Sequence, residues 1–237
     1  MFMNLVLFQS EDEAKFLPSS DPRVIHVRDV LRMKVFDTMY VGVLNGKRGL
    51  AKIVKEDDAG LHFEIAWEEK VFSFLPIHLV VGLPRPQTAR KILSECTTLG
   101  VKSISFFQAE KSDPNYIQSK LWKTDEWQRI LLRGAEQAFV TIVPNVSHYE
   151  NLKEFLCIRD KDTDVVALDN YEATRHLRDY VKKSKETILV IGPEGGFDKA
   201  ERTLLRGNDI PLYHLGERVL RSETACVSAI GLLLGKV

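Results

Sequence analysis

From Phe74-Leu75-Pro76 onward, short apolar segments of strand length alternate with longer segments of helical periodicity. This alternation constrains the fold most, because strands that alternate with helices along a chain form a largely parallel sheet with helices on its faces. The expected strands are IHLVVGL, KSISFFQ, DVVALD, TILVIG and PLYHLG, and the expected helices are QTARKILSECTTLG, DEWQRILLRGAEQAF, ENLKEFLCI, ATRHLRDYVKK, DKAERTLLR and SETACVSAIGLLL. Residues 76–237 are therefore predicted to form an α/β domain.

Residues 1–75 are predicted to form a separate β-rich domain, with the segments NLVLFQ, TMYVGVL, GLAKIVKE and LHFEIAWEEK as four strands of a small barrel. Asn45-Gly46 indicates a hairpin between two of them, because Asn and Gly readily take the positive φ of a tight turn. Asp21-Pro22 predicts the cap and first position of a helix that continues to about Met33.

Composition excludes several classes of protein. The 237 residues carry 33 Lys and Arg against 33 Asp and Glu, and no third of the chain is strongly basic, so an RNA partner would be held by a face or groove rather than by overall charge. No apolar run approaches the roughly 18 residues of a membrane span, and the amino terminus turns acidic where a signal peptide needs a cleavage site. Three cysteines without CxxC spacing argue against a disulfide framework or zinc ribbon. We expect a cytoplasmic protein with no membrane segment and no metal.

Motifs that are absent exclude further functions. No two glycines are separated by one residue, so the G-x-G turn of dinucleotide sites is missing, as are the Walker A, HExxH and G-x-S-x-G motifs. NAD-dependent oxidoreductases, P-loop NTPases, zincins and serine hydrolases are therefore disfavoured.

Two segments near the carboxyl terminus carry the functional signal. In Thr187–Phe197 an apolar strand runs directly into Gly192-Pro193-Glu194-Gly195-Gly196, whose glycines would let bare backbone approach a ligand at a strand end. In Leu215–Ala225, LGERVLRSETA precedes an apolar helix. Its Ser222 suits an N-cap and Glu223 a first helical turn, but helix stability does not explain its two arginines.

These two segments, GPEGGF at 192–197 and LGERVLRSETA at 215–225, resemble the RsmE-type SPOUT methyltransferases, which methylate N3 of a uridine in 16S ribosomal RNA. HVRDVLR at 26–32 is similar to the amino-terminal PUA-like barrel of that family. Weaker similarities follow in the family's order at Leu99-Gly100-Val101, Glu110-Lys111-Ser112, Ala135-Glu136-Gln137 and Pro144.

The resemblance implies a SPOUT methyltransferase domain with a carboxyl-terminal trefoil knot at 76–237, preceded by a small PUA-like β-barrel domain at 1–75. It also implies a homodimer and S-adenosylmethionine as cofactor, bound in a cleft made by the loops of the knot. The residues expected to bind the cofactor are Leu168, Ile191, Gly192, Gly196, Leu215, Gly216, Leu220 and Thr224.

The implied reaction sets chemical requirements of its own. The lone pair of uracil N3 becomes available only when its proton leaves, so the site must accept that proton and stabilise negative charge on O2 and O4. Arg221 is our first candidate for the charge-stabilising residue and Arg218 the second. Glu194 or Glu223 could accept the proton, although either carboxylate could instead pair structurally with an arginine.

RNA contacts are expected from His26, Arg28, Arg32, Lys34 and Arg218, with a solvated charged face as the alternative for the first four. Phosphate contacts would orient the RNA, and the uridine would be extruded into the cofactor cleft. The chain departs from the family at Thr98, where Glu is usual, at Ala138-Phe139-Val140, where Arg is usual, and at Lys111, where Arg is common. These departures affect the RNA substrate more than the methyl donor.

The leading hypothesis is a homodimeric methyltransferase acting at uridine N3 of 16S rRNA in the small ribosomal subunit. The alternatives are a SPOUT methyltransferase with a different RNA target and a non-catalytic RNA-binding protein of ribosome assembly.

Overall fold

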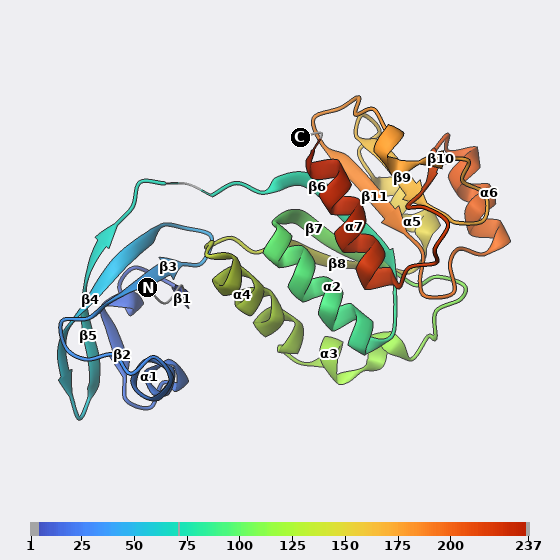
Figure 1. Ribbon diagram of the computed structural model, residues 1–237. Helices are drawn as coiled ribbons and strands as arrows, with labels where there is room; N and C mark the ends of the chain where they lie inside the picture. The colour runs from blue at the N-terminus through green and yellow to red at the C-terminus, as the bar shows by residue number, and fades with distance from the viewer. Residues whose placement is uncertain (1–4, 71, 236–237) are drawn as a thin grey trace. The chain divides into compact units, whose positions relative to one another are not determined.

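The computed structural model describes residues 5–70 and 72–235 (Figure 1). The chain divides into two compact units, each treated by itself below. The first comprises residues 1–73 with 132–143, and the second comprises residues 74–131 with 144–237. The sequence had placed 132–143 with the second domain, whereas these residues group with the first unit.

Within the described part of the first unit, five strands form a mostly antiparallel sheet in the order β1-β3-β4-β5-β2, with only β1 and β3 parallel. The four expected strands are present; Asn4 of the first lies outside the described residues. The structure adds a short strand, β2, whose three residues are too few for a periodic signal. The strands are β1 (Leu5–Phe8), β2 (Phe16–Pro18), β3 (Thr38–Val43), β4 (Arg48–Asp57) and β5 (Gly60–Trp67).

The hairpin and the helix cap of the first unit are as the sequence indicated, whereas the helix is shorter than expected. Asn45 takes φ 56° in the hairpin between β3 and β4. The Asp21 side chain caps α1 (Pro22–Ile25) by accepting a hydrogen bond from the Arg23 N–H at 2.8 Å. A π-helical turn, η2 (His26–Val30), continues the helix, which ends before the expected Met33.

The described part of the second unit contains a sheet of seven parallel strands in the order β10-β12-β9-β11-β6-β7-β8. The five expected strands are all present, and the structure adds β8 and β10. The strands are β6 (Leu75–Gly82), β7 (Val101–Phe107), β8 (Asn145–Tyr149), β9 (Asp164–Leu168), β10 (Arg175–His176), β11 (Thr187–Ile191) and β12 (Leu212–His214).

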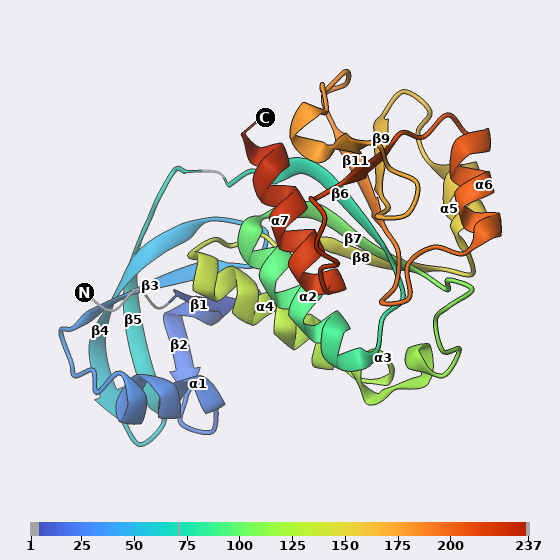
Figure 2. The same cartoon turned by 45° about the vertical axis from the view of Figure 1, so that its right-hand side comes forward.

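Both faces of this sheet are covered, which explains why its central strands are apolar without alternation. On one face Val80, Ala167 and Val190 pack in a core with residues of α5 and α6. On the other face α2 and α7 run side by side (Figures 1 and 2). The helices that follow β6 in the chain are α2 (Pro86–Leu99), α3 (Lys120–Lys123), α4 (Glu126–Ala138), α5 (Leu152–Ile158), α6 (Lys199–Gly207) and α7 (Ser222–Leu234), and the residues of α4 from 132 onward group with the first unit.

The predicted helix ATRHLRDYVKK is wrong. The segment instead forms β10 and the 3-10 turn η4 (Leu177–Asp179). Leu177 and Tyr180 have helical spacing, but both are buried in a non-helical segment, and the Tyr180 hydroxyl donates to Asp164 Oδ2 at 2.9 Å. Pairing of β10 with β12 and this side-chain contact outweigh local periodicity.

Helix α7 is apolar nearly all round, which predicted burial in a core or a subunit interface. Ser222, Cys226, Ala229, Ile230 and Leu233 are buried, and α7 packs against α2, β6, β11 and η4. Burial raises the pKa of the Cys226 thiol, next to Cys96 of α2, so this thiol stays protonated inside the contact. Val227 on α7 is exposed.

Candidate active site

A cavity of about 290 Å³ lies in the second unit at the carboxyl ends of three neighbouring strands. Leu168 at the end of β9 is in register with Ile191 of β11 on one side and with Tyr213 of β12 on the other. The loops after these strands therefore leave the sheet at one edge, where open α/β sheets bind ligands. The volume lies just below the range of roughly 300–1,000 Å³ that is usual for small-molecule sites.

Most residues expected to bind the cofactor line this cavity, namely Leu168, Ile191, Gly192, Gly196, Leu215 and Leu220. Gly216 and Thr224 are not among the lining residues. On α7 the lining residues are Ser222 and Ala225, which are three positions apart, whereas Thr224 is exposed on a different face. Helical spacing from Ser222 was the signal that could have identified Ala225.

The glycine-rich loop after β11 needs its glycines for shape. A Cβ on Gly192 would lie 2.9 Å from the Phe197 nitrogen, which leaves no space for a side chain. Gly196 has φ +66°, and its N–H donates to the Pro193 carbonyl at 2.8 Å. The loop is thus a tight turn that brings bare backbone to the cavity wall.

Lys111 holds the glycine-rich loop by hydrogen bonds to its backbone. Its ammonium donates hydrogen bonds of 3.0 Å to the carbonyls of Gly195 and Phe197. The sequence indicated Lys111 as part of a weak family similarity, with Arg more common at that position, and did not place it in the site.

Asp169 and Arg202 fix the loop after β9, and the sequence did not identify this role for either. Asp169 Oδ1 accepts hydrogen bonds from the N–H groups of Tyr171 and Glu172, while Oδ2 pairs with Arg202 Nε at 2.7 Å. The Arg202 guanidinium lies over the Tyr171 ring at 4.7 Å. Asp169 and Tyr171 line the cavity, so the ion pair of Asp169 with Arg202 shapes one of its walls.

Helix α6 behind that wall has a complete capping box. Asp198 accepts from the Glu201 N–H, and Glu201 accepts from the Asp198 N–H at 2.8 Å and from the Glu110 N–H at 3.1 Å. Burial raises the pKa of Glu201. The box anchors both Arg202 and the end of the glycine loop.

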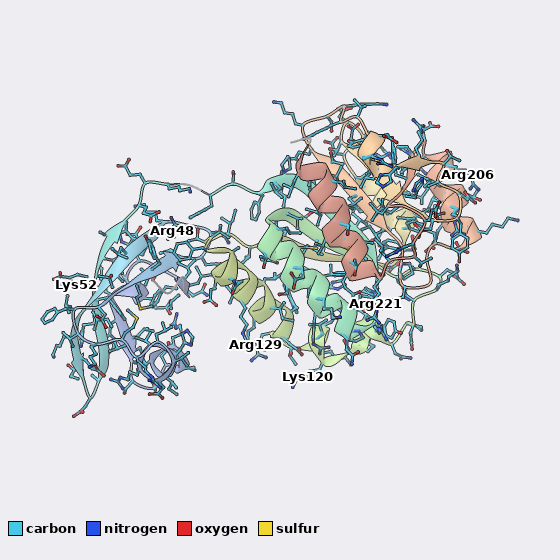
Figure 3. The ribbon with its side chains drawn as sticks, viewed as in Figure 1. Arg48, Lys52, Lys120, Arg129, Arg206 and Arg221 are labelled. Atoms are coloured by element: carbon cyan, nitrogen blue, oxygen red, sulfur yellow. The ribbon has the colours of Figure 1, made fainter. Side chains whose placement is uncertain are left out.

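The proposed catalytic side chains differ in whether they line the cavity. Glu194 lines it and accepts a hydrogen bond from the Arg85 N–H at 3.2 Å. Arg218 and Arg221 are exposed, and Figure 3 shows Arg221 at the start of α7, immediately before the lining residue Ser222.

Glu223 lies outside the cavity lining and pairs with Lys91 at 3.0 Å. Burial alone would raise the pKa of Glu223, but its own backbone N–H, Lys91 and Arg221 lower it below the ordinary value. A carboxylate with a lowered pKa is a poor proton acceptor, so this pairing matches the structural alternative foreseen for Glu223.

The proposed RNA-binding residues of the first unit, His26, Arg28, Arg32 and Lys34, have different surroundings. Arg28 pairs with Glu56 at 2.7 Å. His26 lines a cavity of about 460 Å³ with Arg23, Arg133 and Gln137. Arg32 and Lys34 are exposed beyond η2. Arg133 lies more than a hundred residues from His26 in the chain, so no local pattern joins the two.

Phe139 belongs to the first unit and packs there. Its ring contacts Tyr40 edge to face at 4.6 Å, and the Arg48 guanidinium lies over it at 4.6 Å. The departure from the family at this position is therefore a packing contact.

Two further observations concern metals and membranes. Among residues 5–70 and 72–235, no group of three or more His, Cys, Asp or Glu side chains is placed to hold a metal ion. No helix in this part of the chain has the length and apolar character needed to cross a membrane.

Residues 72–234 match the RNA methyltransferase domain family. The chain is 27% identical over 229 residues to Ribosomal RNA small subunit methyltransferase E 1 of Borreliella burgdorferi, covering 96% of this chain and 95% of the relative. It is 29% identical over 244 residues to Ribosomal RNA small subunit methyltransferase E of Treponema pallidum, covering 98% and 91%.

A solved structure has the same mixed α/β fold with a parallel sheet. It is Ribosomal RNA small subunit methyltransferase E from Neisseria gonorrhoeae bound to S-adenosyl methionine, with a TM-score of 0.81 at 21% identity over 99% of this chain and 98% of that one. The family match spans most of the chain and includes every residue that lines the cavity, and the relatives carry the name that the two motifs predicted. The chain belongs to the RNA methyltransferase domain family.

Proposed function

We propose that this protein uses S-adenosylmethionine to methylate N3 of a uridine in 16S ribosomal RNA of the small subunit. The observation that carries the proposal is the glycine-walled cavity at the carboxyl ends of β9, β11 and β12, with Arg221 next to it at the start of α7. The names of the relatives support the substrate class. A protein acting on ribosomal RNA would work in the cytoplasm.

The cavity residues fit the cofactor. The side chains of Leu168, Ile191, Leu215 and Leu220 offer an apolar slot suited to adenine, and the backbone of Gly192 and Gly196 offers hydrogen-bonding groups without side chains in the way. Glu194 and Glu217, which also line the cavity, suit a cationic ligand. When bound, S-adenosylmethionine supplies a methyl group on a sulfonium, which is a good leaving group.

The chain's own residues then handle charge and the proton. Arg221 is exposed, and although it lowers the pKa of Glu223 it forms no ion pair at contact distance within the described ranges, so its guanidinium is available to stabilise negative charge on the uracil oxygens. Both glutamates pair with a cation, Glu194 with Arg85 at 3.6 Å and Glu223 with Lys91 at 3.0 Å, but only Glu194 lines the cavity, so we assign the proton to Glu194, directly or through water. Arg218, also exposed, is assigned to the RNA backbone.

The finer architecture is proposed with this function. Helix α7 packs across β6 and β11, whereas β12 lies on the far side of β9, so the chain between His214 and Ser222 crosses the strand ends near the loop after Leu168. That crossing supports a trefoil knot in a SPOUT domain at 76–237. The small sheet with helix α1 supports a PUA-like domain at 1–75.

A homodimer is proposed because α7 and the segment before it keep apolar surface exposed, with Val219 86% and Val227 37% exposed. A chain alone would leave this surface in water. Light scattering at micromolar concentration should give the mass of two chains; a stable monomer would refute the dimer.

Arg221 provides the test of the function. Nucleosides from the rRNA of a deletion strain should lack N3-methyluridine, and wild type but not Arg221→Ala should restore it. In vitro, Arg221→Ala should lower kcat about 10²- to 10³-fold, while calorimetry gives nearly unchanged cofactor affinity. Arg178→Ala, an exposed arginine in η4, is the matched control. An unchanged N3-methyluridine level in the deletion strain would point to another RNA, and Arg221→Ala that retains the biological role would point to a non-catalytic assembly protein.

A further inference from the structure

Phe36 is an exposed aromatic residue in a backbone conformation that favours glycine. It has φ +78°, and the residue is 69% exposed. For a bulky side chain such a φ is an outlier, and strain of this kind persists where the surrounding structure holds it, often at functional positions. The strain at Phe36 lowers the stability of the fold, so its presence needs an explanation.

Packing provides that reason for another phenylalanine of this unit but not for Phe36. Phe139 also has positive φ, 62°, and its ring packs on Tyr40 and Arg48. Within the described ranges no aromatic ring packs against Phe36, and most of its surface faces water. Burial of the ring therefore does not offset the strain of the Phe36 backbone conformation.

Backbone hydrogen bonds hold the turn that presents this ring. The Phe36 N–H donates to the Ile53 carbonyl at 2.7 Å, and the Ile53 N–H donates to the Asp37 carbonyl at 3.0 Å, which ties the turn to β4. The Lys34 N–H donates to Asp37 Oδ2 at 2.7 Å, which closes the turn and engages that carboxylate. The ring is thus displayed on a fixed support.

One lysine lies against the ring, and two further exposed cations belong to the same segment of the chain. The Lys52 ammonium lies 5.2 Å from the ring centroid, and Figure 3 labels this residue on β4. Arg32 and Lys34 are exposed in the same segment as Phe36. None of these three cations takes part in an ion pair within residues 5–70 and 72–235.

We propose that Phe36 is a stacking platform for an unpaired RNA base, with Arg32, Lys34 and Lys52 contacting the adjacent phosphates. An exposed aromatic ring among unpaired cations is the combination that binds single-stranded nucleic acid, because every base has a π face and every nucleotide a charge. Duplex RNA keeps its bases stacked internally and offers this ring nothing equivalent. The inference rests on the proposed RNA substrate and adds a specific contact outside the cavity.

The test separates stacking from structure through substitutions at position 36. Phe36→Gly removes the ring and suits the positive φ, so its midpoint of thermal unfolding should not fall. Its affinity for a short fluorescein-labelled oligouridine, measured by anisotropy with the full chain, should fall about 10-fold. Phe36→Leu, apolar but without a π face, should lose affinity similarly, and Phe36→Trp should keep it. Val30→Ala, which trims a residue 64% exposed in the same unit, is the control and should bind like wild type.

The outcomes distinguish this inference from the proposed function. If Phe36→Gly and Phe36→Leu bind the oligouridine as wild type does, or if Leu is as good as Trp, the stacking role is refuted even when methylation of rRNA is intact. If the deletion strain retains N3-methyluridine but the Phe36 series behaves as expected, the proposed reaction fails and the RNA contact stands.

Discussion

The carboxylate of Asp169 and the guanidinium of Arg202 form an ion pair of 2.7 Å in which the two side chains are only 1% and 12% exposed. It joins the loop after β9 to α6, the helix that follows the glycine-rich loop. Within the described residues Arg202 Nη2 is buried without a hydrogen-bond partner, so Asp169 is the main compensation for this charge. The loop after β9 therefore depends on a buried contact with the helix that follows the glycine-rich loop.

Asp169→Asn should destabilise the protein by about 3–5 kcal/mol, because it leaves a buried guanidinium without its counter-charge. Cofactor affinity should fall with it, since Asp169 also orders the N–H groups of Tyr171 and Glu172. Denaturant unfolding and calorimetric titration measure the two effects. Glu172→Gln is a matched control in the same loop. Glu172 pairs with Arg206, which like Arg202 lies on α6, but this pair is exposed. Its loss should therefore lower the free energy of unfolding by only about 0–1 kcal/mol. Equal effects of the two variants would contradict this account.

Lys111→Met should weaken cofactor binding about 5- to 10-fold with little loss of stability. The substitution keeps most of the apolar stem but removes the two hydrogen bonds that hold the carbonyls of Gly195 and Phe197, worth about 1 kcal/mol at an exposed position. Lys199→Met, an exposed lysine at the first position of α6, is the control. If calorimetry gives the same dissociation constant for both variants, Lys111 does not position the loop.

Gly192→Ala should destabilise the protein by about 1–3 kcal/mol and impair cofactor binding, because the new Cβ would meet the Phe197 nitrogen at 2.9 Å and the turn must shift. Gly207→Ala is the contrasting variant. Nothing lies within 4 Å of its Cβ position at the end of α6, so helix propensity should make it neutral or stabilising by up to about 1 kcal/mol. A neutral Gly192→Ala, judged by thermal unfolding and calorimetry, would disprove the steric argument.

Tyr180 should make stability depend on pH in alkaline solution. Burial, with the Asp164 carboxylate nearby, raises the pKa of its hydroxyl from 10.0 to about 12. A raised pKa in the folded state contributes stability that is complete below pH 10 and is lost as pH rises towards 12, by about 2–3 kcal/mol. Denaturant unfolding between pH 9 and 12 should show this loss in wild type beyond that of Tyr180→Phe. Parallel curves for the two proteins would mean that Tyr180 titrates normally.

The sequence predicted the regular elements well where periodicity and end signals agreed. Helix α6 has its capping box at Asp198 and Glu201, and α2 ends at Gly100 in a left-handed conformation, as glycine permits. The prediction failed at 173–183, where Leu177 and Tyr180 have helical spacing but serve contacts with distant residues. Strands β8 and β10 were missed because their residues are only partly buried or too few to show a pattern.

By itself the sequence determined the α/β order of elements, the glycine-rich turn and the motif by which the chain is related to its family, because these are written in local runs of residues. Only the tertiary structure decided which side chains share the cavity. Register places Leu168 beside Ile191 and Tyr213, the phase of α7 selects Ser222 and Ala225 over Thr224, and packing brings Lys111, Asp169 and Arg202 to loops far away in the chain. Such neighbours depend on how strands and helices pack, a long-range relationship for which no local pattern exists.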